Sequence, residues 1–343
     1  MPRVSVIIPT YNRAAMIKRA VASVLQQTYT DFEVIVADDG SNDDTGDSLR
    51  HLSEKVKYVF LEHGGRSYAR NHALRLATGT YIAFLDSDDE FFPHTLGTQI
   101  EQLEKNLDYG MVYGQAICVN EQGEQITIYP ADASGWIYDR VAFYIPLTII
   151  LPTVMVRKSV LDRVGGFDEK MERFEDTDMW RRISKRYKIG AIQQPLCKIL
   201  THAGNALGDP AVELRNVKYY IDKVLREDKD AGTSFKRKGA ANLFHHYGVA
   251  VWHKEDCYGG PSIRFALYAL RYWPFETQYY HLLLPLRFWK SRSAFLLTLL
   301  RRLRMAFHFV VGQLKLHGST LRLLVTDPKE FLRRLKKRLG SLI

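Results

Sequence analysis

The sequence predicts an α/β fold, in which a mainly parallel sheet carries helices on both faces and a helical region follows it. Up to about residue 200, short runs of β-branched residues alternate with segments whose apolar residues recur at helical spacing. Beyond Gly208-Asp209-Pro210 the pattern becomes almost wholly helical. We therefore expect two domains, at residues 1–207 and 208–343.

The first domain opens with two pairs of strand and helix. A run of β-branched residues at 4–8 predicts a strand, and apolar residues at helical spacing within 13–27 predict the helix after it. The strand signal returns at 33–37, and turn-forming residues then lead into a short helical stretch at 46–53. This order is typical of a parallel sheet.

The same alternation continues along the chain. Strands are predicted at 56–61 and 81–85, with a helix at 70–77 between them. The rest of the domain mixes the two types, with strands predicted at 111–118, 125–129 and 153–156 and helices at 159–164 and 176–187.

Polar residues gather where the predicted strands end. Thr10-Tyr11-Asn12 follows the first strand, Asp38-Asp39 follows the second, and Asp86-Ser87-Asp88-Asp89 follows the fourth. Sheets of this kind bind ligands at the carboxyl ends of their strands. We therefore expect these residues to form a ligand site.

The net charge of +10 is distributed unevenly along the chain. Residues 1–204 hold 23 Lys and Arg against 27 Asp and Glu, a net charge of −4, whereas residues 205–343 hold 25 against 11, a net charge of +14. Such asymmetry indicates an anionic partner surface for the second part. With 46% hydrophobic residues and three widely separated cysteines, the chain is neither a disordered tail nor a disulfide-stabilised scaffold.

Residues 282–343 predict basic amphipathic helices. Apolar residues recur every three or four positions from Leu296 to Leu314, and Arg301 and Arg304 fall on another face. Such helices fit the inner face of a membrane, which we favour, and packing on the first domain or in a homo-oligomer is the alternative. No motif for reading nucleic acid accompanies the charge, so we expect no nucleic-acid partner.

The expected location follows from two further observations. No apolar stretch near the C-terminus approaches the roughly 20 residues that a membrane-spanning helix needs, and the N-terminus lacks the regions of a signal peptide. We therefore expect a cytoplasmic protein that is peripheral on the inner face of the membrane.

The acidic run after the fourth strand is the densest chemical signal. Asp86 and Asp88 could meet a divalent cation, since Mg²⁺ or Mn²⁺ takes one or two protein carboxylates together with phosphate oxygens. A nucleoside diphosphate would supply those oxygens. The alternative is a solvated acidic turn that caps the next helix.

A second acidic cluster opens a predicted helix at Glu175-Asp176-Thr177-Asp178. These carboxylates either cap the helix through its dipole or supply a general base to an acceptor hydroxyl. We assign Asp176 as the base and give Asp178 a structural role. Further along, His202 is either structural or a neutral imidazole ligand for a divalent ion.

Six motifs, in this order, make the first domain resemble the family 2 glycosyltransferases, which have a GT-A fold. They are Val4-Ser5-Val6-Ile7-Ile8-Pro9-Thr10-Tyr11-Asn12-Arg13, Val36-Ala37-Asp38-Asp39-Gly40-Ser41, Gly65-Arg66-Ser67-Tyr68-Ala69-Arg70-Asn71, Phe84-Leu85-Asp86-Ser87-Asp88-Asp89, Gly165-Gly166-Phe167-Asp168 and Glu175-Asp176-Thr177-Asp178-Met179-Trp180.

The resemblance implies a role for each matching residue. Asp88 and His202 would hold the divalent cation, and Asp176 would be the catalytic base. One departure is that the Tyr-Arg pair common before the histidine is replaced here by Cys197-Lys198-Ile199-Leu200-Thr201. The nucleotide sugar would be bound by Pro9, Thr10 and Tyr11 at the base, by Asp38 and Asp39 at uracil and ribose, by Arg70 near the base and diphosphate, and by Asp86, Ser87 and Asp88.

The predicted function is therefore a metal-dependent, inverting glycosyltransferase of the hexosyltransferase class, acting in polysaccharide biosynthesis. It would move a sugar from a nucleotide diphosphate donor, most simply a UDP-sugar, to a hydroxyl of a glycan or lipid-linked glycan. A cation at Asp88 would stabilise the charge that develops on the departing diphosphate, and one base suffices for a single displacement with inversion.

Two alternatives stay open at this point. A sugar-nucleotide nucleotidyltransferase would usually carry a Gly-rich phosphate loop where this chain has Pro9-Thr10-Tyr11-Asn12. A non-catalytic glycan- or nucleotide-binding scaffold would tolerate loss of Asp86, Asp88 or Asp176, all of which are present.

Overall fold

The computed structural model describes residues 2–49, 56–143, 149–201, 209–255, 261–274, 276 and 279. The chain divides into two compact units, Met1–Ala206 and Leu207–Ile343. His202 and the predicted amphipathic helices of 282–343 lie outside the described residues, so their predicted roles stay predictions. No helix in the described ranges combines the length and apolar character that a membrane span requires.

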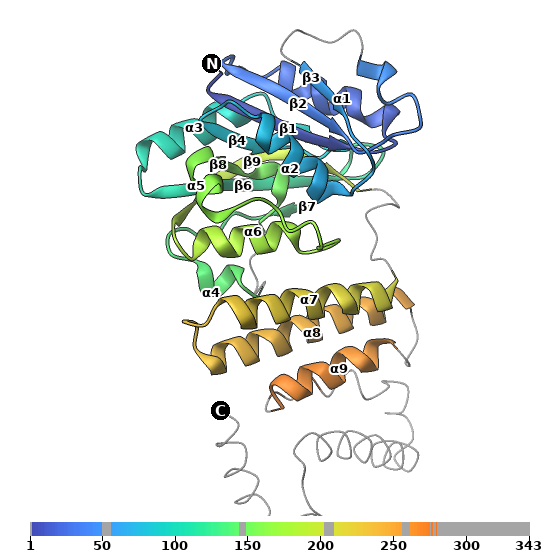
Figure 1. Ribbon diagram of the computed structural model, residues 1–343, viewed down its shortest axis with the longest axis vertical. Helices are drawn as coiled ribbons and strands as arrows, with labels where there is room; N and C mark the ends of the chain where they lie inside the picture. The colour runs from blue at the N-terminus through green and yellow to red at the C-terminus, as the bar shows by residue number, and fades with distance from the viewer. Residues whose placement is uncertain are drawn as a thin grey trace, which may run out of the picture. The chain divides into compact units, whose positions relative to one another are not determined.

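A mixed sheet forms the centre of the first unit (Figure 1). Its first four strands are mutually parallel in the order β3-β2-β1-β4, and β8 then runs antiparallel between β4 and β6. The strands in sheet order are β3 (Val56–Phe60), β2 (Phe32–Asp38), β1 (Val4–Thr10), β4 (Tyr81–Phe84), β8 (Met155–Arg157), β6 (Tyr109–Val119), β9 (Lys188–Leu200) and β5 (Glu90–Phe91), and β7 (Gln125–Tyr129) pairs with β6.

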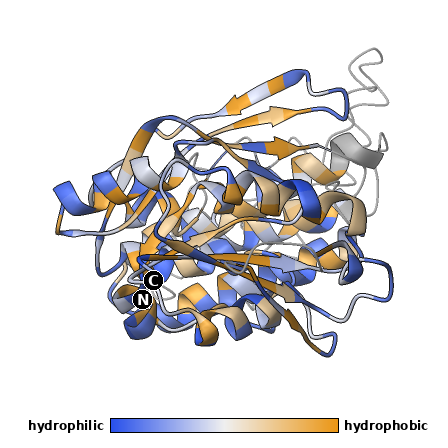
Figure 2. Ribbon diagram, turned by 90° about the horizontal axis from the view of Figure 1, so that it is seen from above, coloured by the Kyte–Doolittle hydropathy of each residue, from blue (hydrophilic) through white to orange (hydrophobic). Residues whose placement is uncertain are grey.

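Helices cover both faces of this sheet, as the sequence predicted. All seven residues of the central strand β1 are buried, because alternate side chains enter the two hydrophobic cores. Hydrophobic residues run along the strands in Figure 2. One core contains side chains of α1 (Ala14–Leu25) and α3 (Thr95–Lys105), and the other contains side chains of α2 (Arg66–Leu76), α5 (Lys158–Val164) and α6 (Glu175–Ser184).

Several elements differ from the sequence expectations. Helix α3 was not predicted, α2 begins four residues earlier than expected at Arg66, and the expected helix at 46–53 is a short 3-10 turn at Asp47–Leu49 in its described part. Strand β9 is 13 residues long although Gln193-Gln194-Pro195 interrupts its apolar pattern. The remaining short elements are α4 (Tyr138–Val141) and a 3-10 turn at Leu151–Thr153.

The second unit is helical where it is described. It contains α7 (Pro210–Glu227), α8 (Thr233–Glu255) and α9 (Pro261–Tyr272). Asp209 caps α7, accepting a hydrogen bond from the N–H of Ala211 at 2.6 Å, and proline occupies the first helical position. Phe244 of α8 stacks on Tyr268 of α9 with ring centroids 5.0 Å apart, so the two helices pack through aromatic rings.

Candidate active site

A cavity of about 750 Å³ opens at the carboxyl ends of β1, β2 and β4. This is the edge of the sheet at which the sequence predicted a ligand site. Nine of the predicted site residues line it, namely Pro9, Thr10, Tyr11, Asp39, Arg70, Asp86, Ser87, Asp88 and Asp176. Asp38 does not line the cavity, and His202 lies outside the described residues.

An aromatic pair forms part of the cavity lining. The ring of Tyr11 is 4.5 Å from the ring of His63, and both residues line the cavity. The turn that presents Tyr11 is fixed by Asn12, which adopts a positive φ of 52° and donates its N–H to the Ser41 hydroxyl at 2.8 Å. His63 was not predicted from the sequence. It follows the end of β3, so the rule that directed attention to the other strand ends would also have found it.

Asp39 fastens the start of helix α2. Its carboxylate accepts the N–H of Gly64 at 2.8 Å and of Gly65 at 2.9 Å, and His63 Nδ1 lies 2.9 Å from the same group. Gly65 has a φ of +91°, which an L side chain would adopt only with strain. The hydrogen bonds between Asp39 and Gly65 therefore hold both residues in place.

Asp38 does not line the cavity. It is fully buried, with one carboxylate oxygen accepting the Tyr58 hydroxyl at 2.6 Å and the other accepting the Ser41 N–H at 2.8 Å. Burial and the hydrogen bond to Asp38 raise the pKa of Tyr58 above its usual value. Asp38 thus holds the Ser41 turn in place, and direct contact with a nucleotide stays a prediction.

Arg70 connects the two acidic motifs. Its guanidinium is buried and donates from Nη2 to Asp86 at 2.7 Å and from Nη1 to Glu175 at 3.0 Å. Two carboxylates around one guanidinium offset the cost of burying these charges. Because Glu175 precedes Asp176, this ion-pair network links the turn after β4 to the first turn of α6.

The three aspartates after β4 have different surroundings. Asp86 is paired with Arg70, and Asp89 is buried and accepts the N–H of Leu200 at 3.1 Å. Burial, with the charges of Asp86 and Asp88, raises the pKa of Asp89 well above its usual value. Asp88 lies beside Arg13, with a shortest N–O distance of 3.9 Å.

The fit of these residues to a divalent cation depends on how many ligands the protein must supply. No group of three or more His, Cys, Asp or Glu able to hold a metal occurs within the described residues. Mg²⁺ nevertheless needs only one or two protein carboxylates when phosphate oxygens complete its shell, and Asp88 lines the cavity. The N–H of Leu200, two residues before His202, bonds to Asp89. Asp88 therefore fits the predicted role.

Asp176 lies in the first turn of α6 and faces the same cavity. Its carboxylate accepts the N–H of Thr177 at 2.6 Å. Burial, followed by the neighbouring Glu175 charge, raises the pKa of Asp176 to about 6. A carboxylate with a pKa near the working pH is suited to accept a proton from a substrate hydroxyl.

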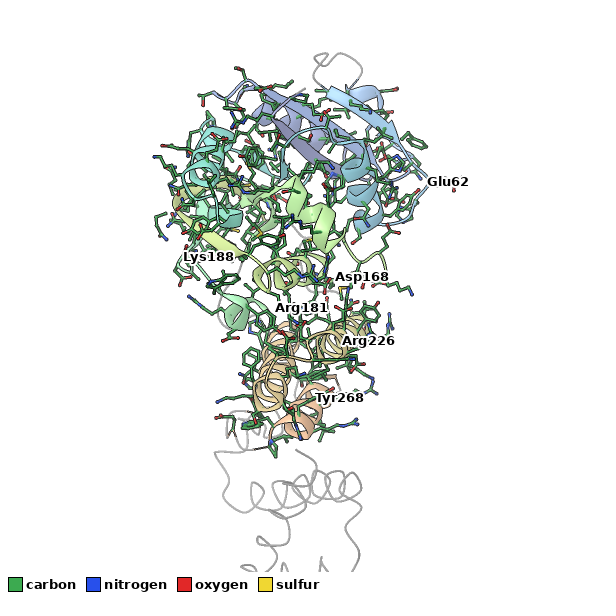
Figure 3. The ribbon with its side chains drawn as sticks, turned by 60° about the vertical axis from the view of Figure 1, so that its left-hand side comes forward. Glu62, Asp168, Arg181, Lys188, Arg226 and Tyr268 are labelled. Carbon is green, nitrogen blue, oxygen red and sulfur yellow. The ribbon has the colours of Figure 1, made fainter. Side chains whose placement is uncertain are left out.

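Asp178, two residues on, has no access to the cavity. It is fully buried and pairs with Arg181 at 2.8 Å, which Figure 3 labels, and with Arg182 at 2.9 Å. Arg182 in turn donates to the carbonyl groups of Val164 at 2.7 Å and Gly166 at 2.8 Å. This geometry gives Asp178 the structural role that the sequence favoured.

Asn71 of α2 also holds the loop at residues 164–168, whose carbonyl groups accept hydrogen bonds from Arg182. Its amide accepts the N–H of Phe167 at 2.8 Å and donates to the Phe167 carbonyl at 2.9 Å. The residues that follow the loop, Glu169, Met171 and Glu172, line the cavity. The Gly165-Gly166-Phe167-Asp168 motif therefore positions the wall of the site instead of lining it.

Comparison with known proteins identifies the family. The model of glycosyl transferase family 2 matches residues 5–165. An uncharacterized glycosyltransferase of Rickettsia prowazekii (strain Madrid E) is 30% identical over 269 residues, which cover 75% of this chain and 81% of that protein. The chain spans only 29% to 37% of the length of three other Rickettsia relatives, which it matches at 33% identity.

Solved structures show the same fold. Residues 1–349 of S. aureus TarS in complex with UDP-GlcNAc align with a TM-score of 0.60 at 20% identity, covering 79% of this chain and 81% of that one. The mannosyltransferase PcManGT of Pyrobaculum calidifontis, in complex with GDP-Man and Mn²⁺, aligns with a TM-score of 0.52 at 23% identity over 87% and 85%. These likenesses confirm the predicted GT-A fold. On its sequence and its fold together, the chain belongs to glycosyl transferase family 2.

Proposed function

We propose that this chain is a metal-dependent, inverting glycosyltransferase that moves a sugar from a UDP-sugar to a hydroxyl of a glycan or lipid-linked glycan. The observation that carries the proposal is that Asp88 and Asp176 line one cavity with the residues expected to bind the nucleotide. A place for the leaving diphosphate and a base for the acceptor thus occur together.

The donor half of the proposal rests on the strand ends. Tyr11 and His63 offer aromatic surface for a nucleobase, and base stacking on aromatic side chains is favourable for any base. The solved complexes of TarS with UDP-GlcNAc and of PcManGT with GDP-Man support a nucleotide-sugar donor. UDP is favoured here through the resemblance of Asp38 and Asp39 to the uracil-binding pair.

The reaction we infer is a single displacement. Asp176 accepts the proton of the acceptor hydroxyl while the hydroxyl oxygen bonds to the anomeric carbon. The bond from that carbon to the diphosphate oxygen breaks at the same time. Asp88 would hold a divalent cation whose charge offsets the negative charge gained by the diphosphate. Attack opposite to the leaving group inverts the anomeric configuration.

The fixed network prepares this step. Arg70 keeps Asp86 and Glu175 in place before substrate arrives, so little reorganisation is needed when charge develops. The Mn²⁺ in the PcManGT complex supports a divalent cation in the proposed reaction.

A donor screen tests the proposal. Purified chain would be incubated with UDP-sugars and GDP-sugars, with Mn²⁺ or with EDTA, in the presence or absence of membrane lipid extract, and released nucleotide would be quantified. We expect release of UDP that depends on Mn²⁺ and on added acceptor. Release that is unchanged by EDTA would exclude the metal, and the absence of both binding and release with every nucleotide sugar would overturn the function.

A further inference from the structure

Three arginines line the cavity within the described residues, and they differ in how their charge is used. Arg70 is buried between Asp86 and Glu175, at 2.7 Å and 3.0 Å. Arg66 is more than half exposed and lies 3.8 Å from Glu175. Arg13 is one-third exposed, and its shortest contact with a carboxylate is 3.9 Å, to Asp88. Arg70 thus makes two close ion pairs, whereas Arg66 and Arg13 have only longer contacts with the described carboxylates.

The guanidinium of Arg13 has little to bond to in this state. Its Nη1 donates to the sulfur of Met16 at 3.4 Å, and thioether sulfur is a weak acceptor. It makes no hydrogen bond to an oxygen atom in the described part of the chain. A guanidinium carries five N–H donors in a planar fork, so most of the binding capacity of Arg13 is unused.

The backbone of Arg13, in contrast, is firmly fixed. Its N–H donates to the hydroxyl of Thr45 at 2.9 Å, and its carbonyl accepts the N–H of Met16 and of Ile17, each at 2.9 Å, at the start of α1. The preceding residue, Asn12, is held by Ser41. The main chain therefore places the side chain accurately at the cavity while leaving its end able to move.

The position of Arg13 relates it to the leaving group. Asp88 is the carboxylate expected to hold the cation that contacts the diphosphate, and Arg13 lies beside it. A cation on Asp88 would repel the guanidinium and remove its carboxylate partner. Phosphate oxygens bound to that cation would then be the nearest anionic group, and arginine binds phosphate through paired hydrogen bonds.

We propose that Arg13 is a diphosphate-binding residue, which leaves Asp88 when the cation and donor bind and then contacts the phosphate oxygens. This inference rests on the proposed function. It assigns to Arg13 both competition with the cation at Asp88 in the empty site and cooperation with it once the diphosphate is bound.

Calorimetry on the full chain separates these two effects. Four titrations would be made into wild type, Arg13→Ala, Arg13→Lys and Lys18→Ala: Mn²⁺ alone, and UMP, UDP and GDP each in the presence of Mn²⁺. Lys18 is the matched control, because it is an exposed cation on the helix that Arg13 caps and does not line this cavity. Circular dichroism would verify that each variant is folded.

The expected pattern has opposite signs for the metal and for the nucleotide. Arg13→Ala should bind Mn²⁺ alone more tightly than wild type, because a competing positive charge is gone, and should bind UDP about tenfold more weakly or worse. UMP should lose less affinity than UDP. Arg13→Lys should recover part of the UDP affinity, and Lys18→Ala should match wild type in all titrations.

The outcomes that contradict the inference are distinct from failure of the proposed function. If wild type binds UDP with Mn²⁺ and folded Arg13→Ala binds it within twofold, Arg13 does not contact the diphosphate. An equal loss for UMP and UDP would also overturn that assignment, as would weaker binding of Mn²⁺ alone. If wild type binds neither UDP nor GDP, the proposed function fails and the inference fails with it.

Discussion

The two sides of the cavity hold their charged groups in different ways. The donor wall, which we define as residues 9–13, 39, 63–70 and 86–89, contains carboxylates already bonded to arginine or to backbone N–H groups. The acceptor wall, residues 149–152 and 169–176, contributes apolar side chains and the exposed carboxylates Glu169 and Glu172. None of its described lining residues is lysine or arginine.

This difference indicates which kind of ligand each wall can bind. Prebonded carboxylates with nearby arginines suit a ligand that always brings the same anionic group, because the protein then needs little rearrangement. A wall of apolar and acidic side chains repels anions and suits an uncharged hydroxyl. Under the proposed function, the donor wall would bind the diphosphate and the acceptor wall would deprotonate the acceptor.

Asp176→Asn gives the sharpest separation of the two walls. The amide preserves shape but cannot accept a proton, so turnover should fall by about 10² to 10⁴-fold while UDP affinity stays unchanged. Turnover would be measured by UDP release and affinity by calorimetry. Asp162→Asn, an exposed aspartate of α5 that does not line the cavity, is the control. A rate within about threefold of wild type would remove Asp176 from the role of base.

Asp178→Asn tests what fixes the acceptor wall. Asp178 is fully buried between Arg181 and Arg182, and removing one member of a buried ion pair leaves the other charge uncompensated. Urea unfolding should therefore show a loss of about 3 to 5 kcal/mol. Asp162→Asn breaks an exposed pair with Lys158 and should cost at most about 0.5 kcal/mol. Equal losses in the two variants would mean that the Asp178 pairs add nothing to stability.

Asp88→Ala addresses the donor wall. Loss of the carboxylate expected to hold the cation should reduce the Mn²⁺-dependent part of the UDP affinity by at least about tenfold. Calorimetry with and without Mn²⁺ measures it, with Asp44→Ala as control, since Asp44 is exposed and away from the cavity. Unchanged Mn²⁺ dependence in a folded variant would place the cation elsewhere.

The sequence predicted the parts of the fold in which local pattern and tertiary role agree. Strands β1, β2 and β4 are continuous apolar runs because both faces of the sheet are covered. Helix α3 was missed because its buried polar residues depend on distant partners. The buried side chain of Gln99, for example, donates from Nε2 to the carbonyl of Thr153 at 2.8 Å.

The candidate site shows the same limit. Its acidic and aromatic residues could be predicted, since strand ends on one edge of a parallel sheet converge. Which of these residues pair with one another could not be predicted, because the pairs join remote segments of the chain. Arg70 meets Glu175 across 105 residues, and no local signal distinguishes its use from that of Arg13.

The smallest expected effect is a shift in the pH profile of the reaction. It tests whether charges of the donor wall influence Asp176 in the acceptor wall. Asp176 has a pKa raised to about 6 by burial and by Glu175, and it acts as a base only when deprotonated. Below pH 6, kcat/KM should therefore fall about tenfold for each pH unit, and above it kcat/KM should level off. The Arg70 charge opposes this rise in pKa, and Arg70 pairs with Glu175 of the acceptor wall and with Asp86 of the donor wall.

Glu175→Gln removes a negative charge beside Asp176 and releases Arg70 from one partner. Both changes favour the carboxylate, so the acidic limb should move to lower pH. A limb that stays in place, or moves to higher pH, would show that the charge of Glu175 does not reach the base.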